Sequence, residues 1–181
     1  MKIEAALFLL AIFAMAAAAQ APTPATSLVV TPGISLTIRA VNEVFKIGSP
    51  VDIDITLKND SGHDFKIADV GDGRALCNYR VAVRDEKGNI PPETHFGIMQ
   101  NGNIDASNWE HSVLSVGEMI SHCIGHIVLT SDFRSGDSRH DLLDVRGSYN
   151  LAVPGRYSIQ IIKHDGGIYA KSNTISVTIN P

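Results

Sequence analysis

Apolar and polar residues alternate strictly between residues 51 and 58, in the sequence VDIDITLK. Because successive side chains of a strand point to opposite faces, this pattern predicts a strand with one apolar face formed by Val51, Ile53, Ile55 and Leu57. The turn-forming residues 59–62 predict that the strand ends at the surface. An apolar face of this kind needs a second sheet to cover it.

The same alternation recurs along the chain, at residues 34–39, 65–67, 79–84, 157–161 and 175–179. The last two segments are predicted to form a hairpin, and a further strand is expected at 120–129. About seven or eight short strands without an amphipathic helix predict an all-β fold, specifically an immunoglobulin-like antiparallel two-sheet sandwich. A single sheet closed into a cylinder fits less well, because two long irregular connections interrupt the spacing of the strands.

The first 19 residues have the pattern of a signal peptide. Residues 5–19 are an unbroken apolar run that ends in small residues, with Ala17 and Ala19 placed for cleavage. The alternative is an uncleaved anchor, but a run of about 15 residues is short for a bilayer that needs roughly 20. The expected organisation is a signal peptide (1–19), an extended Pro-rich segment (20–33) and one domain (34–181).

Charge and localisation narrow the expected partners. The net charge is −4, and the basic residues are interspersed with acidic ones. Sequence-independent binding of nucleic acid needs clustered cations, so no nucleic-acid partner is expected. The signal peptide predicts a secreted or periplasmic protein without a stable membrane span after cleavage.

Two long polar connections interrupt the predicted strands. The first, 90–111, is predicted as a loop with the composition of a recognition surface, and its candidate partner-binding residues are His95, Phe96, Met99 and Trp109. Trp109 has an alternative role, which is to cover an open end of the sandwich. The second connection, 130–149, offers few apolar residues, with one helical turn possible around Leu142.

Cys77 and Cys123 are the only two cysteines. In an exported chain this even count suggests a disulfide, and the alternative is two separate thiols too far apart to bridge. Cys123 also lies in a possible metal or redox cluster with His122 and His126. On a regular strand, however, the two histidines and the cysteine point to opposite faces, so no metal site and no cofactor are expected.

No motif for catalysis stands out. The sequence has no G-x-S-x-G element, and its seven histidines do not mark a general base. We therefore expect a protein that is not an enzyme. The sequon at Asn59 lies in a predicted turn, where a glycan could be accommodated, although an exported bacterial protein usually leaves such a site without a glycan.

Several segments resemble a known family. They are FKIGSPV at 45–51, LKNDS at 57–61, YRVAVRDEKGN at 79–89, LSVGE at 114–118 and PGRYSIQI at 154–161. They resemble immunoglobulin-like domains of secreted bacterial proteins, and within that group they are similar to the intracellular proteinase inhibitor-like (BsuPI-like) family. The resemblance implies the sandwich fold and, by analogy, inhibition of a protease. The signal peptide and Val116, where the family pattern favours Pro, depart from it.

These observations lead to one expected function with two alternatives. The chain is expected to be a non-catalytic exported domain that recognises a protein or a cell-envelope partner through its loops. The first alternative is a secreted protease inhibitor. The second is a small metal-binding or redox protein that uses His122, Cys123 and His126.

We expect the exported protein to begin at or within a few residues of Gln20, because the small residues before it suit a signal peptidase. N-terminal sequencing of the secreted form measures this. Recovery from the membrane fraction of a chain that still carries residues 8–19 would show the anchor instead.

Overall fold

The computed structural model of the chain describes residues 29–70, 75–101, 128–165 and 167–181. This part of the chain is all-β, as predicted, apart from one short helix and two 3-10 turns. The elements in chain order are β1 (Ile34–Ala40), β2 (Val44–Lys46), β3 (Asp52–Asn59), β4 (Phe65–Val70), η1 (Ala75–Cys77), β5 (Arg80–Asp85), α1 (His95–Asn101), β6 (Val128–Phe133), β7 (Ser138–Asp144), η2 (Val145–Gly147), β8 (Gly155–Asp165), β9 (Ile168–Lys171) and β10 (Ile175–Asn180).

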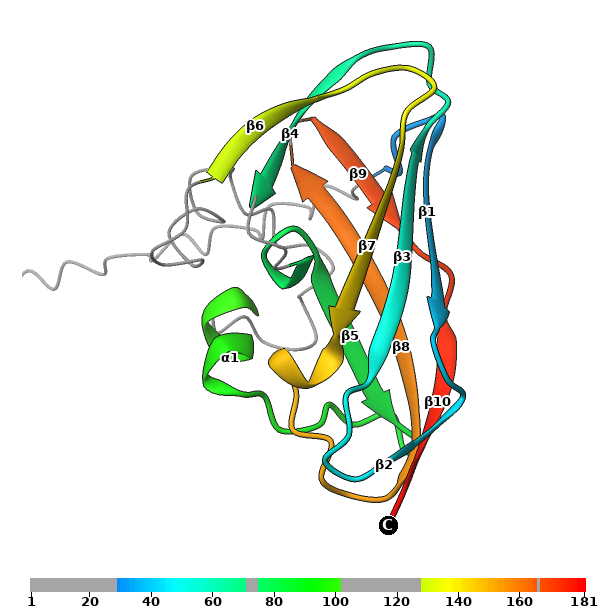
Figure 1. The fold of residues 1–181 in the computed structure, drawn as a ribbon, viewed down its shortest axis with the longest axis vertical. Helices are drawn as coiled ribbons and strands as arrows, with labels where there is room; N and C mark the ends of the chain where they lie inside the picture. The colour runs from blue at the N-terminus through cyan, green and yellow to red at the C-terminus, as the bar shows by residue number, and fades with distance from the viewer. Residues whose placement is uncertain (1–28, 71–74, 102–127, 166) are drawn as a thin grey trace, which may run out of the picture.

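The strands form two principal sheets and one strand pair. The first sheet has the order β1-β3-β7, and the second has the order β2-β10-β8-β5, with β9 paired to one end of β8. All pairs are antiparallel except β2 with β10. Among the described strands, β4 and β6 pair only with each other, and in Figure 1 they arch over one end of the molecule.

The core lies between the inward faces of the two sheets. Ile53, Ile55 and Leu57 of β3 are at most 1% exposed, and they share one hydrophobic cluster with Ile159 and Ile161 of β8. This confirms the strand that the alternation at 51–58 predicted. The last two predicted segments do pair, because β8 and β10 are antiparallel neighbours, but they do not form a simple hairpin, because β9 lies between them in the chain and also pairs with β8.

Side chains join the two sheets along the β1 side. Asn173, between β9 and β10, accepts a hydrogen bond from the Ile38 amide (2.9 Å) and donates one to the Ile38 carbonyl (3.1 Å). Thr31 donates its amide to the Tyr169 carbonyl and accepts from the Tyr169 amide, both at 2.8 Å. These contacts satisfy backbone groups that an open sheet edge leaves unpaired.

Asn59 is a structural residue and not an open glycosylation site. It is fully buried, and its amide nitrogen donates to the carbonyls of His63 (2.8 Å) and Phe133 (2.9 Å). Its amide oxygen accepts from the amide and the hydroxyl of Ser61. The expectation that a glycan could be accommodated here is therefore wrong for the folded chain.

The predicted polar connection over 130–149 is wrong, because this segment contains most of β6, all of β7 and η2. The inward positions of β7 are Arg139, Asp141 and Leu143, so only one of three is apolar, and the exposed Leu142 points the other way. Because polar and apolar residues are mixed on the inward face, the sequence does not show the alternation that is typical of a strand. The helical turn considered around Leu142 is not found there, because Leu142 lies in β7, and the 3-10 turn η2 follows at Val145–Gly147.

The predicted loop over 90–111 is also wrong in part, because α1 occupies residues 95–101. Residues 102–111 lie outside the described part of the chain. Of the strand predicted at 120–129, Val128 and Leu129 begin β6, and the remainder lies outside the described residues. Strands β2 and β9 are short and were not predicted.

Ile55→Ala is expected to lower the free energy of unfolding by about 2–5 kcal/mol, because it removes a buried side chain and leaves a cavity. Thr56→Ala, on the outward face of the same strand, is the matched control and is expected to change it by less than about 0.5 kcal/mol. Urea denaturation measures both. Equal losses for the two variants would contradict the observed orientation of β3.

Candidate functional site

The predicted partner-binding residues are only partly brought together. His95 is exposed and Phe96 is half-buried, and both begin α1. Met99 lies within the same helix. Trp109 lies outside the described residues, so its two proposed roles stay predictions.

The predicted cysteine pair is described at one end only. Cys77 is 5% exposed at the end of η1. Cys123 lies outside the described residues together with His122 and His126, so the disulfide stays a prediction. Within the described ranges, no group of three His, Cys, Asp or Glu side chains is placed to hold a metal ion. In the same ranges, no helix has the length and hydropathy needed to cross a membrane.

Helix α1 is fixed to the segment that follows β7. Thr94 caps the helix, because its hydroxyl oxygen accepts from the Gly97 amide (3.0 Å), and the same hydroxyl donates to the Gly147 carbonyl (2.5 Å). The Thr94 amide donates to the Ser148 carbonyl (2.9 Å), and the Asn150 amide donates to the Pro92 carbonyl (2.7 Å). The helix therefore has a defined position on the sheets.

Gly97 brings the helix backbone against this segment. A Cβ atom at Gly97 would lie 2.1 Å from the Ser148 carbonyl oxygen, so only glycine allows this approach. On the solvent side, His95 is exposed and Ile98 is 45% exposed. The helix thus presents an apolar and a polar side chain to solvent from a backbone that is held in place.

A buried ion pair lies at the other end of the inward face of β8. The Lys163 ammonium lies 2.7 Å from an Asp165 oxygen, and the two side chains are 2% and 0% exposed. Within the described chain neither Asp165 oxygen has a hydrogen-bond donor of good geometry, so this contact is ionic. The ammonium donates to the Ala68 carbonyl (3.2 Å) and lies 5.4 Å from the centre of the Tyr79 ring.

Tyr79 connects this ion pair to β7. Its hydroxyl donates to Asp141 Oδ2 at 2.7 Å. Burial, together with the charge of Asp141 and this hydrogen bond, raises the pKa of Tyr79 far above its ordinary value. The phenol therefore stays protonated at physiological pH and remains a hydrogen-bond donor.

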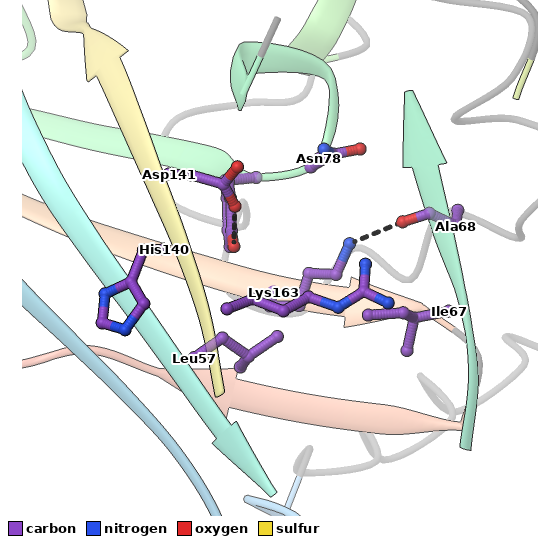
Figure 2. A pocket seen from close by; sticks show the side chains of 9 residues that line it. Leu57, Ile67, Ala68, Asn78, His140, Asp141 and Lys163 are labelled. Carbon is purple, nitrogen blue, oxygen red and sulfur yellow. Dashed lines mark hydrogen bonds between the residues drawn. The ribbon is translucent and has the colours of Figure 1, made fainter. Parts of the chain in front are cut away.

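These side chains line a cavity of about 310 Å³ between β4, β7 and β8. Figure 2 shows Lys163 at its centre, with Ala68 and Ile67 on one side and Asp141 and Asn78 on another. The remaining lining residues are Leu57, Tyr79, Arg139 and His140. Three of the nine lining residues are apolar and the other six are polar or charged, so the cavity presents several hydrogen-bonding and charged groups to a small molecule.

Sequence reasoning missed the lysine and the aspartate, although the signal was present. The alternation that begins at Tyr157 and includes Ile159 and Ile161 places Lys163 and Asp165 on the same inward face. The sequence predicts this strand only over 157–161, where the apolar pattern ends, whereas β8 continues to Asp165. The chain then turns at Gly167, which has a φ of 83°.

No protein-family model and no curated protein sequence matches this chain. Among solved structures, it is similar to the alkylpurine DNA glycosylase AlkC of Pseudomonas fluorescens, bound to DNA containing an abasic site analogue, with 9% identity and a TM-score of 0.41. That match covers 82% of this chain and 31% of the glycosylase chain, so this chain spans about a third of the glycosylase.

The chain is also similar to AvmM, which catalyses macrocyclization in alchivemycin A biosynthesis, with 8% identity and a TM-score of 0.39. This match covers 84% of this chain and 91% of the AvmM chain. Similarities of this size carry no argument about fold or function. A function for this chain therefore rests on its own geometry.

Gly97→Ala is expected to lower the free energy of unfolding by about 1–3 kcal/mol, because the added methyl group meets the Ser148 carbonyl and must displace the helix. Ile98→Ala, at the next and exposed position, is the control and is expected to change stability by less than about 0.5 kcal/mol. Urea denaturation and amide hydrogen exchange over 95–101 measure the effect. A Gly97→Ala protein with unchanged stability and exchange would contradict the close approach.

Proposed function

We propose that this chain is an exported, non-catalytic binding domain of immunoglobulin-like fold that engages a protein or cell-envelope partner through α1. The observation that carries the proposal is the way the helix is held, with Thr94 and Gly97 fixed to the segment after β7 while His95 and Ile98 point to solvent. A recognition element that is already ordered loses less conformational entropy when it binds.

The strand order supports the immunoglobulin-like part of this proposal. In such sandwiches the first, second and fifth strands share one sheet, and the third, sixth and seventh share the other. Lettered in this way, β1, β3 and β7 correspond to strands A, B and E, and β5, β8 and β10 correspond to C, F and G. Strand β2 then extends the second sheet as a parallel neighbour of β10.

The remaining parts of the proposal come from the sequence. They are cleavage of residues 1–19, a secreted or periplasmic location, membership of the BsuPI-like group and a disulfide between Cys77 and Cys123. If the partner of α1 is a protease, the proposed function is inhibition of that protease.

The experiment compares capture by three purified baits from envelope extract: the wild-type protein, Ile98→Asp and Leu142→Asp. Both substitutions place a carboxylate at an exposed apolar position, 45% exposed for Ile98 and 56% for Leu142, but Leu142 lies on the outer face of β7. We expect Ile98→Asp to reduce capture of a specific partner by at least tenfold, as for a central interface residue. Leu142→Asp is expected to capture it like the wild type.

Melting temperatures of the three baits establish that folding is equal. If Ile98→Asp captures the same partner as well as the wild type, α1 is not the binding surface. If Leu142→Asp alone loses it, the outer face of the first sheet takes that role.

A further inference from the structure

We propose that the cavity between β4, β7 and β8 binds a small zwitterion, a molecule such as an α-amino acid that carries a carboxylate and an ammonium group. This site is separate from α1, and the inference does not depend on the function proposed above. It follows from the polar groups that the cavity presents and from the balance of their charges.

The donor for the ligand carboxylate is Lys163. Its ammonium has three N–H groups, and the described residues provide one hydrogen-bond acceptor, the Ala68 carbonyl, and one ionic contact, Asp165. The third N–H has no hydrogen-bond acceptor among these residues, and the ammonium lines the cavity although its side chain is 98% removed from solvent. A buried N–H without an acceptor costs free energy, and a bound carboxylate removes that cost.

The acceptor for the ligand ammonium is Asp141. Its Oδ2 atom accepts from the Tyr79 hydroxyl, and its Oδ1 atom has no hydrogen-bond donor in the described chain. Because Tyr79 stays protonated and fixes one oxygen, the carboxylate holds its orientation on the cavity wall. The two ligand-binding groups therefore come from different sheets, β8 for the ammonium and β7 for the carboxylate.

Charge balance selects a ligand without net charge. The charged side chains in and directly behind the lining are two cations and two carboxylates, namely Lys163, Arg139, Asp141 and Asp165. A simple anion at Lys163 would meet the negative charge of Asp165 and Asp141, whereas a zwitterion brings its own cation to Asp141. The volume of about 310 Å³ is at the lower end of the range of about 300–1,000 Å³ found for small-molecule sites, which suits a small ligand.

The rest of the lining suits a short aliphatic portion of the ligand. Leu57 and Ile67 are 0% and 1% exposed, and the Tyr79 ring covers the Lys163 side of the cavity. The exposed His140 is the lining residue nearest to solvent. An apolar contact of this kind adds affinity without a further polar requirement.

The test is a titration of the purified exported protein, followed by NMR chemical shifts, with three probes: L-alanine, acetate and methylamine. We expect saturable binding of L-alanine and at least tenfold weaker binding of acetate and of methylamine, since each lacks one of the two charged groups. Acetate that binds as tightly as L-alanine, or no saturable binding of L-alanine, would overturn the proposal.

Variants assign the two contacts. Asp141→Asn is expected to weaken L-alanine at least tenfold and to leave acetate binding unchanged or tighter. Lys163→Met combined with Asp165→Leu removes the ion pair as a unit, which keeps the fold because apolar residues of similar size replace both charges. This double variant is expected to lose binding of both L-alanine and acetate.

Leu142→Asp is the matched control, because Leu142 is an exposed residue of β7 that does not line the cavity. It is expected to bind L-alanine like the wild type. Unchanged L-alanine binding in either the double variant or Asp141→Asn contradicts the assigned contacts, and the variants' melting curves establish that each protein is folded.

Discussion

The inward face of β8 is the constraint on which both sheets depend. This strand pairs with β5 on one side and with β9 and β10 on the other, so its side-chain alternation sets the register of the whole second sheet. Because the alternation has a fixed period of two, the face that begins with Tyr157 must continue inward through Lys163 and Asp165. The buried ion pair is therefore a consequence of the strand that builds the core.

An ion pair in this position is not the most stable solution for a core. Removing one partner of a buried pair costs about 3–5 kcal/mol, whereas replacing both by apolar residues is often neutral or stabilising. On this basis, replacing Lys163 or Asp165 alone is expected to destabilise the fold more than replacing both together by apolar residues. A binding role for the ammonium gives a physical reason for a charge that stability alone does not require.

Side chains complete what the strand ladders leave open at the sheet edges. On the β1 side, Asn173 pairs with both backbone groups of Ile38 as a strand neighbour would. On the β5 and β7 side, the Tyr149 hydroxyl donates to the Val81 carbonyl (2.8 Å), and the Tyr79 hydroxyl reaches Asp141. The two sheets are thus linked along both sides, which blunts the tendency of exposed edges to pair with other chains.

The sequence predicts strands well where one face is apolar throughout. Strands β1, β3, β5 and β10 have this character, and their positions agree with the alternation. The prediction from alternation fails at β7, because Arg139 and Asp141 face the cavity and not the apolar core. The end of β8 fails for the same reason, at Lys163 and Asp165.

The candidate sites divide in the same way. The composition of 90–111 points to His95 as a candidate partner-binding residue, which stays a prediction, and the helix that carries His95 depends on contacts with Gly147 and Ser148, about 50 residues away in the sequence. The cavity was missed, because it is formed by residues from β3, β4, β7 and β8 that no local pattern connects. Local periodicity carries information about one strand, and both sites arise from the way several strands meet.

Strand β7 lies between the two proposed sites, so its rigidity bears on whether binding at one site affects binding at the other. Its inward Asp141 lines the cavity, and the segment that follows it, η2, receives the hydrogen bond from Thr94 that holds α1. Spatial continuity alone does not create coupling, which requires an element with two arrangements. Every residue of β7 is paired with a residue of β3 between Asp52 and Lys58. The Asp144 carboxylate also accepts a hydrogen bond from the Val51 amide (3.0 Å). The pairing of β7 along its whole length shows no such second arrangement, so the two proposed sites are expected to bind independently.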